Sequence, residues 1–496
     1  MTEIWLELAV LAAAGFAAGR VLAMPAARRE LRERPQLLLL ALVAAAVCIA
    51  AVVWAALESQ PALRVLTGIA AAGWALAWWR ARPGFGRRRG WPPGSLGLRR
   101  SLEAIARRPF LEEQLRRYGP IFKTAQFHHP VACLVGLEEG RTLLKRAGAD
   151  LVPPPLPLSQ AIPRGFIRYM APEDHRVYSR LLRTGFTPEV VSAVEPFAVE
   201  EAGRALTLLE GSNGQSGVDP RDAVLGYVSA TSLRLTFGEL LAHGDVARIE
   251  GWSRDAEFGD AVGRPTDRAT GALLGFVRLV HERSAESEPV TPCVWREIVR
   301  ASPDAARDET VAGNLFLLHQ ASRESITGLV LWSLQLLGGA PEWCARIEAD
   351  PDAADKVLSE TLRLAQSEYV YRRVVRPLEV GSYRIPEGWM LRICVAESHR
   401  LDPPFERPET FDPARFEHRR FSSSEHSPFG LDEHACLGAR MSLTLARVFL
   451  VALVCGYDWT VVADGPPERR NRHWSHWEPS SAFRIAVTAK RSSSTR

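Results

Sequence analysis

One cysteine of the chain stands where its thiol could do chemistry. Cys436 lies in SPFGLDEHACLGARM (427–441), and the nearest other cysteines, Cys394 and Cys455, are too far away in sequence to form a CxxC pair. The chain has seven cysteines, an odd and scattered set that argues against a disulfide framework and favours a reducing compartment. We therefore expect the role of Cys436 to depend on its thiolate.

The residues around Cys436 predict how that thiolate is held. Residues 437–455 are apolar nearly all round and predict a buried helix. Cys436 would lie at its start, where unpaired amides and the helix dipole favour an anion, and a thiolate is the form that ligates metal. Gly430 and Gly438 permit tight turns beside a flat group, beneath which Phe429 could pack. A buried structural cysteine is the simpler alternative.

The pattern F-G-x-x-x-H-x-C-x-G at residues 429–438 resembles the haem-binding loop of the cytochrome P-450 family, the haem-thiolate monooxygenases. The resemblance implies that Cys436 is the metal ligand, binding the iron of haem b (iron protoporphyrin IX). That family commonly has glycine where this chain has Asp432, a residue that tolerates a left-handed backbone better than most. The residues assigned to the cofactor by this pattern are Phe429, His434, Cys436 and Gly438.

A second motif lies upstream, where LSETLRL places Glu360 and Arg363 three residues apart. Alone, such a pair usually forms a surface salt bridge. In position it resembles the ExxR motif of the same family, because the hairpin sequence VGSYRIPEGWM and then RPETFDPARF follow it. The resemblance implies a buried structural network of Glu360, Arg363 and Arg415, and it extends from about residue 100 to the end of the chain.

A third stretch, PEDHRVYSRLLRTGFTPE (172–189), resembles the helix that reaches the haem propionates. Cationic donors suit two propionates in a pocket of low dielectric constant. The family often has arginine at the position of Ser179. The expected propionate contacts are His175, Arg180, His434 and one of the adjacent pair Arg372 and Arg373, of which we select Arg373. Taken one at a time, these arginines could equally be solvated surface residues.

The stretch 314–339, NLFLLHQASRESITGLVLWSLQLLGG, is apolar at both ends and polar in its middle, which predicts a buried helix lining a cavity. In the family this helix crosses the haem with the pattern small-Gly-x-acid-Thr-Thr. Aligned by the acid, Glu324 and Ser325 become the catalytic pair for proton delivery. Ser322 replaces glycine, and Arg323 adds a cation near the pocket, where it could hold an acidic group of the substrate.

The sequence leaves His319 and Gln320 open, either as pocket residues or as residues facing a neighbouring helix.

From about residue 100 onward, helical periodicity dominates and strands are short. The predicted fold class is therefore mainly α with small β-sheets, and the resemblance implies a cytochrome P-450 fold for the catalytic domain, 100–496. Helices are expected at 187–210, 311–337, 351–365 and 437–455, and strands within 378–396 and the C-terminal FRIAVTA.

Residues 1–90 predict a membrane anchor with three transmembrane helices, at 4–24, 37–57 and 65–79. A spanning helix needs about 20 apolar residues, which the middle segment meets without a charge. Arginines crowd the loop after the first segment and the stretch after the third, and the positive-inside rule places both in the cytoplasm. We expect a multi-pass membrane protein with its catalytic domain on the cytoplasmic side. A cleaved signal peptide is the competing interpretation of the first segment.

Residues 91–99, rich in proline and glycine, are the expected hinge between anchor and catalytic domain.

The resemblance implies a monooxygenase that inserts one oxygen atom of O2 into an organic substrate. The membrane anchor and the apolar stretch 151–170, where the family has a loop covering the substrate, favour a lipophilic one. No nucleotide-binding motif is apparent, so electrons are expected from a separate ferredoxin or flavodoxin. The net charge of +4 is too small to imply nucleic-acid binding, and the arginine-rich composition favours a bacterial origin. Basic residues that could dock an acidic donor are Arg176, Arg183, Arg419, Arg420 and Arg440.

Two alternatives stay open. One is a haem-thiolate peroxygenase, isomerase or dehydratase that needs no reductase, supported by the altered distal motif. The other is a non-catalytic membrane haem-binding protein, against which the retained acid-alcohol pair argues.

Overall fold

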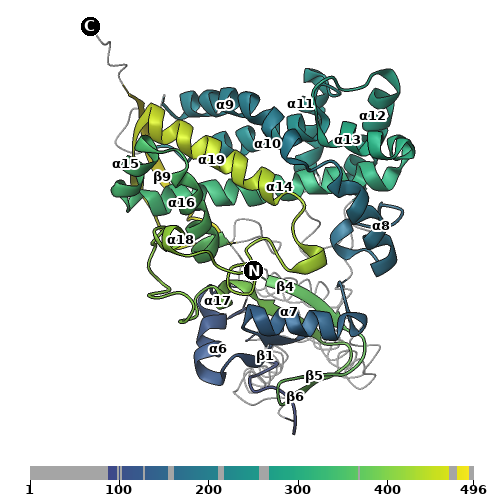
Figure 1. Cartoon of the computed structure of the whole chain (residues 1–496), viewed down its shortest axis with the longest axis vertical. Coiled ribbons are helices and arrows are strands. Elements are labelled where there is room, and N and C mark those ends of the chain that lie inside the picture. Colours follow the sequence, from purple (N-terminus) through teal and green to yellow (C-terminus); the bar gives the residue numbers. More distant parts are fainter. Residues whose placement is uncertain are drawn as a thin grey trace, which may run out of the picture. The chain divides into compact units, whose positions relative to one another are not determined.

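The computed structural model describes residues 88–97, 100, 103–104, 106–126, 129–154, 161–210, 217–255, 267–366, 369–468 and 477–490 (Figure 1). The three predicted transmembrane segments lie outside the described residues, as do residues 98–99 of the hinge and 155–160 of the predicted covering loop. The chain divides into two compact units. The first is Met1–Leu134 with Val374–Arg392, and the second is Val135–Arg373 with Ile393–Arg496.

The first unit is built on short antiparallel strands. Its elements are α6 (Phe110–Tyr118), β1 (Ile121–Gln126), β2 (His129–Leu134), β5 (Leu378–Val380) and β6 (Tyr383–Ile385). β1 pairs with β2 in the register Ile121 opposite Leu134, and β5 pairs with β6. Gly381 takes a φ of 58° in the two-residue turn between β5 and β6, a conformation that favours glycine. Next to β2 in the strand order comes β7 (Met390–Cys394), which begins in this unit.

The described part of the predicted hinge packs against the first unit. The amide of Lys123 in β1 donates to the carbonyl of Pro93 at 2.7 Å, and the buried Lys123 side chain donates to the carbonyl of Pro92. Trp91 meets Trp389 edge to face, with their ring centroids 4.9 Å apart. Residues 91–97 are thus held by backbone hydrogen bonds and aromatic contact.

The second unit is helical and carries the motifs that the sequence singled out. Its helices are α7 (Leu137–Arg146), α8 (Pro172–Arg183), α9 (Pro188–Glu210), α10 (Arg221–Phe237), α11 (His243–Asp255), α12 (Asp267–Glu286), α13 (Val294–Ala301), α14 (Glu309–Gly338), α15 (Pro341–Ala349), α16 (Ala353–Thr361), α17 (Val395–Ser398), α18 (Arg415–His418) and α19 (Ala439–Gly456). Its strands are β3 (Leu151–Val152), which neighbours β4 (Tyr369–Val374), and the antiparallel pair β8 (Tyr457–Ala463) and β9 (Arg484–Ala489).

The predicted elements agree with this architecture. Helices expected at 187–210, 311–337 and 437–455 are α9, α14 and α19, and the C-terminal FRIAVTA contains β9. The stretch 351–365 is α16 followed by a single π-helical turn, η5 (Leu362–Gln366). The fold class, mainly helical with small sheets, is therefore confirmed.

The long helix α14 is the centre of the second unit. It packs against α10, α12, α16 and α19, and in Figure 1 α9, α10, α14 and α19 lie side by side. Asp308 caps its start by accepting from the amide of Thr310 at 2.7 Å, and it ends at Gly338, where an added Cβ would lie 2.4 Å from Val461 of β8. Almost every residue along its middle is buried in one apolar core.

Among the described residues, α19 is the one helix long and apolar enough to cross a membrane. Its buried residues, Met441 and Leu445 among them, pack against α9, α14 and α16 within the second unit. Its apolar character is accounted for by this core.

Candidate active site

Cys436 lies in a turn that leads into α19. The amide of Cys436 donates to the carbonyl of Phe429 at 2.8 Å, which closes the loop on itself. Gly430 has a φ of 88°, where glycine is the residue without steric cost, and its amide donates to the carbonyl of Ser427 at 3.3 Å. Gly438 is the N-cap of α19 and has an ordinary φ of −89°. The helix therefore begins three residues after the cysteine.

Asp432 adopts the left-handed conformation that the sequence predicted for it, with a φ of 50°. Its carboxylate pairs with the guanidinium of Arg141 on α7 at 2.7 Å, and its carbonyl accepts from the amide of Ala435 at 3.0 Å. These contacts offset the steric cost of a left-handed aspartate, so the turn is kept without the glycine.

The thiol of Cys436 is solvent-accessible, although protein atoms surround it closely enough for burial to raise its pKa. A side chain that is both accessible and surrounded lines a recess. The amide of Gly438 and the charges of Arg168 and Arg183 favour the thiolate, but burial outweighs them. The start of the helix thus favours the thiolate as predicted, but this effect alone does not lower the pKa of Cys436 below its ordinary value. A metal cation bound at sulfur would reverse this balance.

A cationic cluster faces the same loop. The buried ring of His175 on α8 lies 4.0 Å from the ring of His434, centroid to centroid. Burial lowers the pKa of His434 to about 3, assisted by the charges of Arg372 and Arg168. Burial also lowers the pKa of His175, as do the charges of Arg183 and Arg372. Three arginines from separate elements therefore place positive charge around the two histidines.

Of the adjacent pair in β4, the structure favours Arg372 over the Arg373 that we selected. Successive strand residues point to opposite faces, and Arg372 is 8% exposed while Arg373 is half-exposed. Within the described part of the chain, the guanidinium of Arg372 donates one hydrogen bond, to the carbonyl of Tyr371 at 2.8 Å. Burial and the charge of Arg168 lower its pKa to about 10.

The structure does not bring Arg180 to this cluster. Arg180 is exposed and lines a shallow recess on the outer face of α8 together with Arg176. Arg180 is five positions after His175, so its side chain points about 140° away from that of His175 around the helix axis. Arg183 takes its place, with a guanidinium nitrogen 3.3 Å from the carbonyl of Glu433.

One face of α14 is open in the middle of an otherwise buried helix. Within residues 310–334, the half-exposed side chains are Leu318, Ala321, Glu324 and Ser325, and all others are buried. Residues three and four apart lie on one helix face, so these four form a continuous strip. The surrounding core leaves these four side chains partly accessible. The acid and the alcohol that the sequence paired are both on it.

Arg323 lies on the opposite side of α14, so the prediction of a cation near the pocket is wrong. Its guanidinium, in a residue 6% exposed, pairs with Glu250 of α11 at 3.3 Å and donates to Gln320 at 3.3 Å. The physical reason is helical geometry. Arg323 is two positions after Ala321, so its side chain is rotated about 200° around the helix axis from that residue of the open strip.

His319, which the sequence left open, also faces a neighbouring helix. Its Nδ1 lies 2.8 Å from the hydroxyl of Ser232 on α10, and burial lowers its pKa to about 3.

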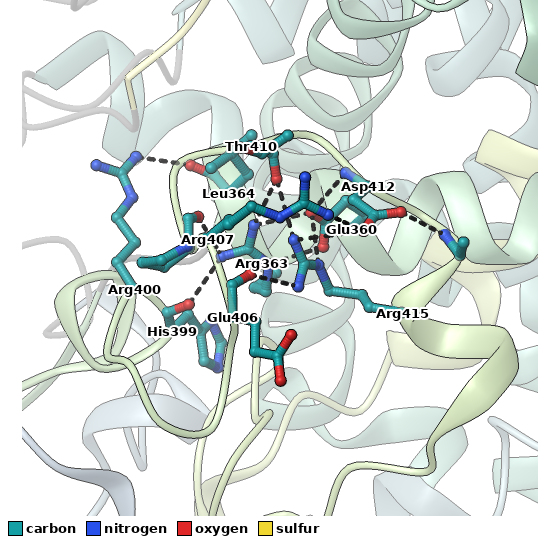
Figure 2. Close-up of polar contacts among 12 residues, drawn as sticks. Glu360, Arg363, Leu364, His399, Arg400, Glu406, Arg407, Thr410, Asp412 and Arg415 are labelled. Carbon is teal, nitrogen blue, oxygen red and sulfur yellow. Dashed lines mark hydrogen bonds and ion pairs between the residues drawn. The ribbon is translucent and has the colours of Figure 1, made fainter.

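Figure 2 shows Arg363 and Arg415 converging on Glu360. Arg363 donates to both oxygens of this fully buried carboxylate, at 2.7 and 2.8 Å, and the Nε of Arg415 donates to it at 3.1 Å. Buried charges persist where they are paired and hydrogen-bonded. Arg363 also donates to three backbone carbonyls, those of His399, Pro408 and Thr410. The structure thus contains the network that the ExxR spacing predicted.

His399 joins this network to the cysteine loop, a link that the sequence did not reveal. Its carbonyl accepts from Arg363 at 2.9 Å, and its buried Nε2 accepts from the amide of Ser427 at 2.9 Å. Ser427 begins the loop that carries Cys436. The contact joins residues 28 apart in the chain, which no local pattern indicates.

The donor set fits a flat metal cofactor with two acidic arms. The buried charge of Arg372 has no carboxylate hydrogen-bonded to it among the described residues, and the buried Nδ1 of His434 lacks a partner there. Two carboxylates would satisfy both groups. The thiol of Cys436, in its recess, would supply a soft ligand to the metal. A thiolate-ligated haem matches all three requirements.

Fold and site together define a haem-thiolate oxidoreductase, and comparisons with known proteins agree. The sequence model of the cytochrome P450 family matches residues 353–485, which contain the Glu360 network and Cys436. Cucurbitadienol 11-hydroxylase of Siraitia grosvenorii is 25% identical over 448 residues, covering 75% of this chain and 89% of that protein. Abscisic acid 8'-hydroxylase 3 of Oryza sativa subsp. indica is 25% identical over 415 residues, with coverages of 75% and 82%.

Solved structures support the same fold. A retinoic acid-bound cyanobacterial CYP120A1 has a TM-score of 0.68 at 20% identity, covering 81% of this chain and 99% of that one. Cytochrome P450 CYP109Q5 from Chondromyces apiculatus has a TM-score of 0.62 at 21% identity, with coverages of 78% and 97%. Residues 353–485 match the cytochrome P450 family, whose cofactor is haem b held by a cysteine thiolate, and the relatives named as hydroxylases agree with a monooxygenase of this kind.

Proposed function

We propose that this protein is a monooxygenase that hydroxylates a lipophilic organic substrate beside the open strip of α14, with electrons from a separate redox protein. The observation that carries the proposal is the open strip of α14, where Glu324 and Ser325 stand beside the apolar side chains of Leu318 and Ala321. An acid and an alcohol that are partly accessible inside a core can move protons, and apolar neighbours suit a substrate poor in polar groups.

Each part of the site has a role in this proposal. Haem, when bound, supplies the redox-active iron at which O2 is activated. Cys436 would hold the iron through sulfur, while His175, His434 and Arg372 would neutralise the propionates. Glu324 and Ser325 would hold and pass protons on the distal side. Leu318 and Ala321 would orient the substrate and exclude water from the strip.

The substrate class rests on composition and on the relatives. Two relatives are named for the hydroxylation of cucurbitadienol and of abscisic acid, and one solved structure is described as bound to retinoic acid. With Arg323 turned into the protein and paired with Glu250, no cation of α14 lies on the open strip within residues 310–334. An apolar substrate without a need for charge pairing is therefore favoured over an acidic one.

A ferredoxin or flavodoxin is the proposed electron donor. Arg176 and Arg180 are exposed on the outer face of α8 around Val177, which is 64% exposed. Arg419, Arg420 and Arg440 are exposed as well. Basic residues around an exposed apolar side chain suit an acidic partner, and reduction by such a partner should slow as salt concentration rises.

The membrane anchor, cytoplasmic orientation and bacterial origin belong to the same proposal. Their support is the arginine distribution and the apolar segments of residues 1–90.

The test of the central assignment is spectroscopic. The reduced protein with carbon monoxide should absorb at the long-wavelength position typical of thiolate ligation, and Cys436→Ser should abolish that band. Cys455→Ser, at an exposed cysteine near the end of α19, is the matched control and should leave it unchanged. A wild-type spectrum like that of a histidine-ligated haem would contradict the assignment. Turnover without any electron donor would instead support a peroxygenase, isomerase or dehydratase.

A further inference from the structure

Gln366 contacts the backbone of α14 at Ser325, one of the residues of the open strip. Its side-chain amide nitrogen donates to the backbone carbonyl of Ser325 at 3.0 Å, and the residue is only 8% exposed. The other atom of the amide, Oε1, is buried and has no hydrogen-bond partner among the residues that the structure describes. Burying an unpaired amide oxygen costs free energy, so the position of this side chain needs an explanation beyond space filling.

The orientation of the Gln366 amide follows from its partner. A carbonyl can only accept, so the nitrogen must face the oxygen of Ser325, and a flipped amide would set two acceptors against each other. The amide as a whole lies beside Gly328, three residues further along α14. A Cβ added at Gly328 would lie 3.1 Å from Oε1 and 3.2 Å from Nε2. The missing side chain at this position makes room for the amide.

The backbone that carries Gln366 is held rigidly. Gln366 ends the π-helical turn η5, whose Arg363 is 1% exposed and bonded to Glu360 and to three carbonyls. Single π-helical turns are rare and occur frequently at functional sites. The amide of Gln366 is thus fixed from the Glu360 network and reaches the carbonyl of the alcohol residue on α14.

A second polar link joins α14 to α16, the helix that leads directly into η5. The hydroxyl of Ser333 on α14 lies 3.2 Å from that of Thr361 on α16, and both residues are fully buried. Holding the two helices together therefore does not by itself require Gln366. What distinguishes Gln366 is its attachment at Ser325 itself.

We propose that Gln366 is a positioning residue for Ser325, its amide fixing the Ser325–Gly328 segment so that the Ser325 hydroxyl keeps its place on the open strip. This inference rests on the proposed function of Ser325 in proton delivery. It makes Gln366 and Gly328 a pair that acts on the reaction without touching the substrate.

The test compares Gln366→Met, which keeps length and removes both polar atoms, with Thr361→Val, which removes the other link. The first readout is amide hydrogen exchange of residues 325–329 in the purified protein. Gln366→Met should speed it roughly fivefold, as expected from the loss of one buried hydrogen bond. Thr361→Val should leave it unchanged. The second readout is coupling, where Gln366→Met should divert electrons into peroxide with little change in KM, and Thr361→Val should not.

Gly328→Ala supplies a second variant, which keeps the test decisive if Gln366→Met does not fold. Its methyl group must displace the amide by a few tenths of an ångström, so it should reproduce the faster exchange and the peroxide. Combining it with Gln366→Met should add little, because both act through one contact. Gly271→Ala on α12, where an added Cβ meets nothing within 4 Å, controls for the general effect of alanine in a helix.

Unchanged exchange and unchanged coupling in both Gln366→Met and Gly328→Ala, whatever their effect on Tm, would overturn the proposal. Equal effects of Thr361→Val on exchange and coupling would overturn it too, since the role would then be general packing. If the wild-type protein consumes no electrons, the proposed function fails separately. The exchange comparison then still decides whether Gln366 fixes the Ser325 segment.

Discussion

At the scale of single residues, neighbours in the sequence of α14 differ in whether their side chains lie on its open strip. Glu324 and Ser325 are on the open strip of α14, whereas Arg323, the residue before Glu324, is buried and pairs with Glu250 of α11. Neighbouring helix positions differ by about 100° of rotation, so one motif contributes both catalytic and structural side chains.

Ser325→Ala should leave haem binding and KM nearly unchanged while diverting electrons from product to peroxide. The change removes a hydroxyl used in proton transfer and leaves the backbone carbonyl that Gln366 holds. The measurement is the ratio of product to electrons consumed, with hydrogen peroxide assayed in parallel. Ser333→Ala, a buried hydroxyl of the same helix, is the control. Full coupling in Ser325→Ala would mean that protons reach the site by another group or by water.

Arg323→Met should lower the free energy of unfolding and leave KM unchanged. It strands the carboxylate of Glu250, whose side chain is 28% exposed, so we expect a loss of about 1–2 kcal/mol, less than for a fully buried pair. Urea unfolding measures the loss, and Arg323→Met combined with Glu250→Gln should recover part of it. A raised KM with unchanged stability would return Arg323 to the substrate site.

At the scale of elements, local helix geometry determines which residues of a motif share a face. Contacts between elements far apart in sequence determine which of those residues reach the site. The spacing of Glu360 and Arg363 predicted a shared helix face because i and i+3 neighbours are fixed by helix geometry alone. The sequence could not choose between Arg372 and Arg373, because strand alternation says that they differ and not which one faces inward. His399 and Gln366 gave no signal, since each acts on a residue at least 28 positions away.

The contact between α10 and α14 predicts a pH dependence of stability. His319 has a folded-state pKa of about 3, against 6.5 for its ordinary value, because burial and the charge of Arg323 disfavour its protonation. The unfolded state therefore binds one more proton than the folded state between these values. Stability from this group is complete above pH 6.5 and falls as pH drops toward 3, by about 1.4 kcal/mol per unit.

His319→Gln removes that group while keeping a polar side chain near Ser232 of α10 and Arg323. Between pH 7 and pH 5 the variant should lose about 2 kcal/mol less stability than the wild-type protein, measured by urea unfolding at each pH. The charged residues near this position are Arg323 on α14 and Glu250 on α11, which pair with each other. Parallel losses in the two proteins would show that His319 does not titrate on unfolding.

At the scale of the whole molecule, the chain combines a helical haem-thiolate unit with an N-terminal region of different composition. The fold class and the family followed from local patterns: the cysteine loop, the ExxR spacing and the polar middle of one helix. The cationic cluster did not follow, because Arg168, Arg183 and Arg372 come from η3 (Ile167–Tyr169), α8 and β4. Which arginines converge is decided by packing between elements far apart in sequence.

Residues 1–90 carry three apolar segments, with arginine-rich stretches after the first and the third. If the positive-inside rule sets their orientation, the unit that carries Cys436 is cytoplasmic. Protease added to sealed, right-side-out cells should leave residues 95–496 intact, and the same protease should digest them once the membrane is permeabilised. Deleting residues 2–90 should move the protein from the membrane to the soluble fraction while preserving the carbon monoxide spectrum of the reduced protein. Digestion of the catalytic part from outside would overturn the orientation. Retention of the truncated protein in the membrane would show that residues 91–496 hold a membrane contact of their own.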